Sequence, residues 1–139
     1  MNLLVLLTAD YANITSDGKL NVMGIFRVIN ATNFPARHTS MHLVLKLGAE
    51  LGEYGTERIL TVKLMSPDGQ EIFNLSGPMQ IPRPEGGLKP EVNAIFELKD
   101  ITFPEPGPYQ FVVLVDKDVK GSLMVYVNKT EPQQGNSQP

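Results

Sequence analysis

Apolar and polar residues alternate with a period of two along most of the chain. Because successive side chains of a β-strand point to opposite faces, this alternation is typical of strands with one face toward a core. No window of useful length repeats apolar residues with the period of a helix. The segments that alternate most clearly, each expected to be a strand, are residues 41–47, 60–64, 92–98, 109–115 and 123–127.

Turn residues separate these segments. Asp17-Gly18 and Asp68-Gly69 each supply the glycine that a tight reversal with positive φ needs. The longest stretch without alternation, residues 77–90, contains four prolines and predicts a crossover between sheets, with a short edge strand at 79–81. The expected hairpins join residues 3–15 to 20–30, residues 57–65 to 70–76, and the last two strands through a turn at 117–121.

These elements predict an all-β fold. About eight strands at regular spacing favour an antiparallel β-sandwich, immunoglobulin-like in broad architecture. Residues 1–128 are expected to form a single domain. Residues 129–139 contain no apolar side chain that could be buried, so they predict a disordered C-terminal tail.

Several strands are apolar on both faces, although a two-layer sandwich buries only one face of each sheet. Residues 3–7 are apolar without exception, and the second strand and the last two show the same excess. The additional side chains need cover, either from loops of this chain or from another protein molecule. The candidate interaction surface that follows comprises Met23, Ile25, Arg27, Ile29, Val112, Leu114, Met124 and Tyr126.

Composition restricts the classes of function. The 139 residues fit one domain, and 42% of them are hydrophobic, enough for a core. The net charge is −3 with scattered basic residues, which argues against a nucleic-acid-binding surface. The absence of cysteine excludes disulfides and catalytic thiols. The apolar run at residues 3–7 is too short for a signal peptide or a membrane span, so we expect a cytoplasmic protein.

Several short motifs occur together along the chain: Ala9–Asn13, Asp17–Phe26, Phe34-Pro35-Ala36 with His38, Pro67-Asp68-Gly69 and Phe103–Phe111. With these motifs the chain resembles a family of small bacterial proteins that is known only as a domain of unknown function. The resemblance covers roughly residues 1–127 and implies a stand-alone β-sandwich, with no known activity and no assigned catalytic residues. Its last motif also contains the Pro-Gly-x-Tyr-x-Phe pattern of many immunoglobulin-like domains, in which the tyrosine anchors the entry to a strand.

Candidate chemistry is sparse. His38 and His42 lie four residues apart, but this spacing loses its meaning when His42 lies in a strand and His38 in the loop before it. Asp116 and Asp118 could contribute to a calcium site, but the neighbouring Lys117 would repel the cation. No Gly-x-Ser-x-Gly motif is present. We therefore predict no catalytic residues, no cofactor and no metal ligands, and a protein that is not an enzyme.

Two charged residues interrupt the apolar strands of the first hairpin. With a tight two-residue turn at Asp17-Gly18, paired positions sum to about 35 to 37, so Asp10 and Arg27 could be cross-strand neighbours. One interpretation is an exposed ion pair worth less than about 1 kcal/mol. The other is a polar spot within an apolar recognition surface, where Arg and Tyr often anchor binding.

The sequence thus leads to two hypotheses about function. The first is a non-catalytic protein-interaction module that binds a protein partner or a second copy, as a homodimer, through the apolar surface. The second is a binder of a small ligand or glycan, or an unrecognised enzyme, that uses loops at residues 30–40 and 77–90. A flat apolar surface would favour the first, and a deep polar pocket between the loops would favour the second.

Overall fold

The structure, a computed structural model, describes residues 1–132 as a chain of β-strands with one short 3-10 turn, η1 (Leu51–Glu53). Residues 133–139, most of the predicted tail, lie outside the described residues. The strands are β1 (Asn2–Ile14), β2 (Leu20–Phe26), β3 (Val28–Ala31), β4 (Ala36–Gly48), β5 (Glu57–Met65), β6 (Glu71–Gln80), β7 (Glu91–Phe103), β8 (Gly107–Val115) and β9 (Asp118–Lys129).

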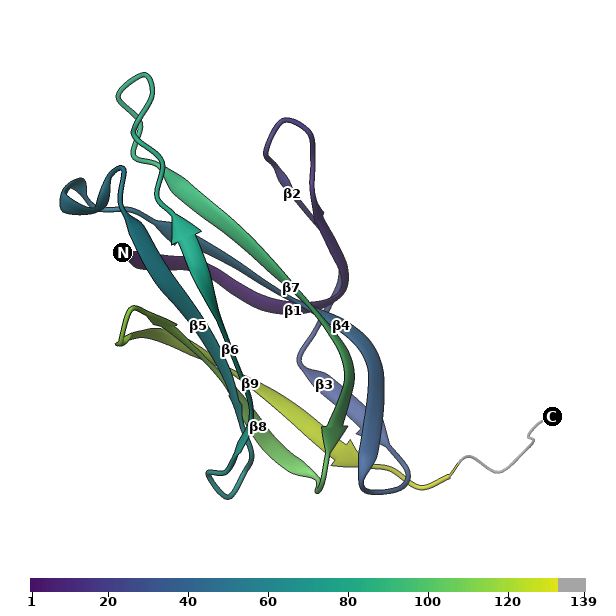
Figure 1. Ribbon diagram of the computed structural model, residues 1–139. Coiled ribbons are helices and arrows are strands. Elements are labelled where there is room, and N and C mark those ends of the chain that lie inside the picture. The colour runs from purple at the N-terminus through teal and green to yellow at the C-terminus, as the bar shows by residue number, and fades with distance from the viewer. Residues whose placement is uncertain (133–139) are drawn as a thin grey trace.

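The strands form two packed sheets (Figure 1). Sheet A has the order β2-β1-β4-β7, and sheet B has the order β3-β9-β8-β5-β6. The prediction of an all-β sandwich is confirmed, with nine strands instead of about eight. The pairing is antiparallel throughout residues 1–132 except at one place, where β3 pairs with β9 in parallel. Likeness to immunoglobulin domains stays a prediction.

The additional strand arises because the predicted strand 20–30 is two elements. It pairs with β1 only as far as Phe26, and the chain then crosses from sheet A to sheet B at Arg27. The Arg27 carbonyl accepts a hydrogen bond from the Tyr126 N–H (2.8 Å), which starts the pairing of β3 with β9. Two other predicted boundaries shift as well, because β4 begins at Ala36 and β6 extends to Gln80 through Pro78 at the sheet edge.

The main core lies between the sheets. Alternate residues of the predicted strands meet there, among them Leu43 and Leu45 of β4, and Val62 and Leu64 of β5, none of which retains exposed surface. The largest buried side chains, Phe103, Tyr109 and Phe111, lie toward the end where β7 passes into β8. Burying an aromatic side chain of this kind stabilises the fold by roughly 2 to 3 kcal/mol.

The β1–β2 hairpin covers the outer face of sheet A. Val44, Ala9 and Ala12 are buried but belong to no part of the main core, so their cover comes from the other side of the sheet. The hairpin bends away from sheet B (Figure 1), and its turn is tied to β7 by the Asn93 side-chain amide, which donates to the Gly18 carbonyl (3.2 Å). β1 approaches β7 closely although β4 lies between them in the sheet. For sheet A, therefore, a segment of the same chain supplies the cover that the two-sided strands need.

Gly24 allows β2 to pass Asp10 within this hairpin. Its φ is +69°, and a Cβ at this position would lie 2.5 Å from the Asp10 Oδ2 atom. We expect Gly24→Ala to lower the free energy of unfolding by about 2 kcal/mol or more, measured by urea denaturation. Gly18→Ala is the matched control, because Gly18 also has a positive φ (+86°) but a Cβ there would meet nothing within 4 Å. We expect Gly18→Ala to lower the free energy of unfolding by only about 1 kcal/mol. Equal losses at the two glycines would contradict the role of the Asp10 contact.

Candidate interaction surface

A second apolar face, on the outer side of sheet B, remains accessible. The cross-strand register places Val28 beside Tyr126 and Tyr126 beside Pro108 in one row. Another row places Val119 beside Leu114. Exposed fractions are 48% for Val28, 43% for Tyr126 and 64% for Val119, so these side chains are open to a partner. Apolar side chains on the outer face of sheet B include Val28, Met65, Pro108, Val112, Leu114, Val119, Met124 and Tyr126.

Arg27 stands at one end of this face. Its Nε donates to the Met124 carbonyl (3.0 Å), at a point of β9 just before the short strand β3 begins to pair with it. Its guanidinium is thereby fixed next to Met124 and Tyr126 while the residue stays exposed. The arrangement combines an arginine, a tyrosine and a methionine, which are residue types enriched at protein interfaces.

The predicted pairing of Asp10 with Arg27 is wrong. β1 and β2 are joined by a five-residue loop, residues 15–19, instead of the two-residue turn on which the prediction depended. The register therefore shifts, so that Tyr11 lies opposite Met23, and the Asp10 side chain packs closely against Gly24. Arg27 is beyond the end of the hairpin and binds sheet B.

The structure divides the predicted surface into three parts. Val112, Leu114, Met124 and Tyr126 share the outer face of sheet B, as their alternation with the buried residues of β8 and β9 indicated, and Arg27 joins them. Met23 and Ile25 are exposed, at 65% and 63%, but they lie on β2 in sheet A. Ile29 is buried and faces the core, so its place in the predicted surface is wrong. The sequence missed Val28, because the crossing at Arg27 changes which residues face outward.

The two histidines have different surroundings in β4. His42 is buried under the hairpin, with Nδ1 3.1 Å from the Asp10 carbonyl oxygen, Nε2 3.6 Å from the Glu97 carboxylate and its ring against Tyr11. His38 lies within the strand instead of the loop before it, next to Phe26. Within residues 1–132, no three His, Cys, Asp or Glu side chains come together in a way that could hold a metal ion.

The aspartates near the last turn are engaged in the fold. Asp116 accepts hydrogen bonds from the Ile59 N–H (3.1 Å) and the Arg58 guanidinium (3.2 Å), and these lower the pKa of its carboxyl group. Asp118 begins β9, because the turn between β8 and β9 comes at residues 116–117, earlier than predicted. Asp116 therefore joins β5 to the β8–β9 turn.

The segments of the alternative hypothesis line separate hollows. Asn30 and His38 border one of about 250 Å³, together with Asp10 and Phe26, and the buried His38 Nε2 has no hydrogen-bond partner among residues 1–132. Residues 77–80 border another of about 360 Å³, mostly apolar, between β6 and β7. The predicted loop at 30–40 is itself wrong, because only residues 32–35 connect β3 to β4.

The chain was also compared with models of known protein families. Residues 4–128 match DUF6941, a family of unknown function. The chain belongs to this family. The match confirms the resemblance to an uncharacterised domain, and in this DUF6941 chain it spans β2 to β8 completely and nearly all of β1 and β9. A search of curated proteins found no match. Among residues 1–132, no helix is long and apolar enough to cross a membrane.

Proposed function

We propose that this DUF6941 chain is a non-catalytic protein-binding module of the cytoplasm, which binds its partner through the outer face of sheet B. The observation that carries the proposal is the difference between the two outer faces. On sheet A, Ala9, Ala12 and Val44 are buried under the β1–β2 hairpin, and the exposed Met23 and Ile25 lie on β2 at the edge of the sheet. On sheet B, Val28, Val119 and Tyr126 keep about half of their surface exposed and share one face that extends across β3, β9 and β8. An accessible apolar face with an arginine and a tyrosine at one end is typical of a protein interface.

The chemistry of the face indicates a folded partner with its own apolar patch. The rows of side chains extend across β3, β9, β8 and β5, which gives a broad surface instead of a pocket. Gln110, Ser122 and Lys63 interrupt the apolar rows and offer hydrogen bonds that fix the orientation of a partner. A small ligand would bury little of its surface on such a face.

Photocrosslinking in the source cells tests this proposal. The photoreactive residue p-benzoylphenylalanine is placed at Tyr126 and, as a matched control, at Tyr11, which has a similar exposed fraction (48% against 43%) but lies in sheet A. We expect a discrete crosslinked product from position 126 only, and its loss when Leu114→Asp is added on the same face. A product of equal yield from both positions, or none from position 126, would contradict the proposal.

A further inference from the structure

β7 is a long strand at the edge of sheet A, and its charged side chains lie toward its two ends, at Glu91 and from Glu97 to Asp100. It has thirteen residues and contains neither proline nor glycine, and within residues 1–132 it pairs with β4 alone. The other sheet edges are less suited to pairing: β6 contains Gly77 and Pro78, β3 has only four residues, and β2 belongs to the bent hairpin. A long regular edge with free N–H and C=O groups is a template for another strand.

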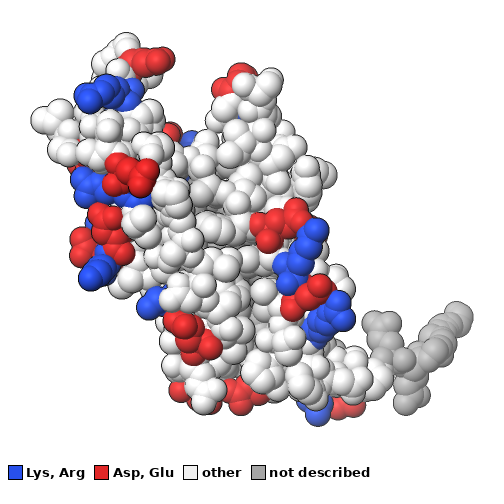
Figure 2. Space-filling view, viewed as in Figure 1, with Lys and Arg blue, Asp and Glu red and all other residues white. Residues whose placement is uncertain are grey.

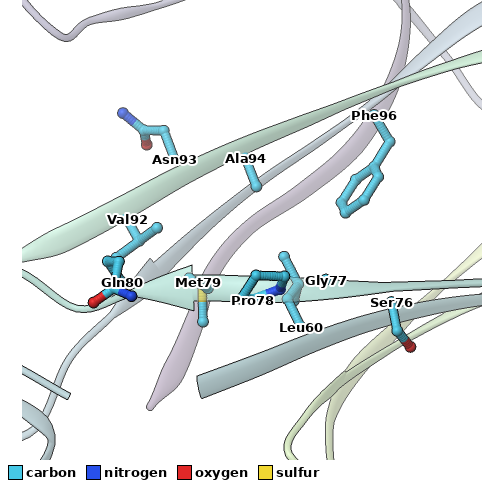
Figure 3. Close-up of a pocket in the computed structure, with 10 residues that line it drawn as sticks. All are labelled: Leu60, Ser76, Gly77, Pro78, Met79, Gln80, Val92, Asn93, Ala94 and Phe96. Carbon is cyan, nitrogen blue, oxygen red and sulfur yellow. The ribbon is translucent and has the colours of Figure 1, made fainter. Parts of the chain in front are cut away.

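The surface next to β7 is hollowed and uncharged. Val92, Ala94 and Phe96 point from β7 toward β6, whereas Asn93 points away (Figure 3), and the hollow between the two strands measures about 360 Å³. Ala94 is the smallest of the three side chains and leaves space between its larger neighbours. Figure 2 shows an uncharged band over this part of the molecule, with acidic and basic side chains along both margins.

We propose that β7 pairs in antiparallel fashion with β7 of a second copy, around a two-fold axis at Ile95, so that two sheets A form one eight-stranded sheet. This self-association uses a surface separate from the outer face of sheet B and is independent of the proposed function. Directly opposed side chains in such a pair lie about 5 Å apart and interact strongly. The proposed register therefore follows from which side chains oppose one another.

The register at Ile95 is complementary in charge and in size. It places Glu91 opposite Lys99 of the second copy, twice by symmetry. Within each chain, Glu91 already pairs with Lys46 (3.2 Å), and Lys99 pairs with Glu97 (2.9 Å). Each new contact between Glu91 of one copy and Lys99 of the other therefore connects two existing ion pairs, and positive and negative charges alternate along the four side chains. On the inner face, Ala94 lies opposite Phe96 of the second copy, so a small side chain meets a large one.

Neighbouring registers are less favourable. With the axis at Ala94, Glu91 would oppose Glu97, and with the axis at Glu97 the two Glu97 side chains would oppose each other; like charges in these positions repel. An axis at Phe96 leaves Lys99 opposite Asn93 and loses both charge pairs. An axis at Leu98 pairs Glu97 with Lys99 but brings in Asp100, whose φ of 56° interrupts the regular strand.

Light scattering on the full chain, with a charge exchange, tests the proposal. The wild-type protein is expected to have about twice the mass of the 15.3 kDa chain. Lys99→Glu and Glu91→Lys should each raise the dimer dissociation constant at least tenfold, because each places like charges opposite each other. The double variant restores opposite charges between the two copies. Its dissociation constant should return to within about fivefold of the wild-type value, since some repulsion inside each chain remains. A tenfold change in this constant corresponds to about 1.4 kcal/mol.

Controls distinguish this dimer from one formed through sheet B. Lys63→Glu and Leu114→Asp, both on the outer face of sheet B, should leave the dissociation constant unchanged. A monomeric wild type up to about 1 mM, where binding would be weaker than about 4 kcal/mol, would overturn the proposal. So would a dimer that is insensitive to the single charge changes, or a double variant that associates no better than the single ones.

A crosslink at the axis tests the register directly. The natural chain has no cysteine, so Ile95→Cys introduces one thiol per copy, opposite its own equivalent. Cβ atoms of opposed residues lie about 5 Å apart, close to the range of about 3.5 to 4.5 Å in disulfides. Mild oxidation should link most of the Ile95→Cys protein into dimers, whereas Asn74→Cys, exposed on β6, should give few. A dimer that forms without this crosslink would overturn the assigned register.

Discussion

Val44→Asp is expected to lower the free energy of unfolding by about 4 kcal/mol, although alternation alone places Val44 on the outside of sheet A. Val44 has no exposed surface, because the β1–β2 hairpin covers it. A carboxylate there would lose its hydration among apolar neighbours, one of the few single changes that cost this much. Urea denaturation followed by circular dichroism measures the loss.

Leu114→Asp is the matched control for this prediction. Leu114 occupies the equivalent alternating position on sheet B, but its face is open and the side chain is half-buried. Its replacement is expected to cost no more than about 1 kcal/mol, since the carboxylate can remain hydrated. The difference between the stability losses of Val44→Asp and Leu114→Asp should shrink at acidic pH. Burial raises the pKa of the carboxyl group introduced at position 44, so this group is protonated as the pH falls and no longer buries a charge. Equal losses at pH 7 would show that the hairpin does not seal the outer face of sheet A.

The comparison of Val44 with Leu114 shows how far alternation along the chain leads. Alternation locates most strands and identifies which residues of β8 and β9 face outward, because the face to which a side chain points depends only on its position along its own strand. It could not show which outer face is covered, since this depends on a hairpin whose strands approach closely at Gly24 and whose turn is tied to β7 through Asn93, far along the chain. Both sheets have two-sided apolar strands in the sequence, and only the fold distinguishes them.

The candidate surface was predicted only in part for a related reason. Residues 20–30 look like one continuous strand, but the chain changes sheets at Arg27, and alternation does not continue across a crossing. Ile29 was therefore assigned to the wrong face, and Val28 was overlooked. Strand order was also unknown, so Met23 and Ile25 were grouped with strands that belong to the other sheet. The free edge of β7 could not be recognised from sequence for the same reason.

Tyr109→Ala is the other change expected to cost about 4 kcal/mol, at the opposite end of the sandwich. Tyr109 is fully buried, and its ring packs edge-on against Phe103 with centroids 4.9 Å apart. Its hydroxyl accepts a hydrogen bond from the Glu105 N–H (3.2 Å) and donates one to the Glu105 carbonyl (2.6 Å), which holds the turn before β8. The alanine variant leaves a large cavity, whereas Tyr109→Phe keeps the ring and should lose only about 1 to 2 kcal/mol.

The pH dependence separates the hydroxyl from the ring. Burial raises the pKa of Tyr109 above its ordinary value of 10.0, because the folded state disfavours the phenolate. A raised pKa in the folded state means that this stabilisation is complete below pH 10 and is lost as the pH rises from there through the folded-state pKa. The difference in unfolding free energy between wild type and Tyr109→Phe should therefore be constant below pH 10 and narrow above it. A difference that stays constant well above pH 10 would mean that the hydroxyl is not held in its neutral form by the fold, and that the two bonds to Glu105 contribute little to anchoring β8.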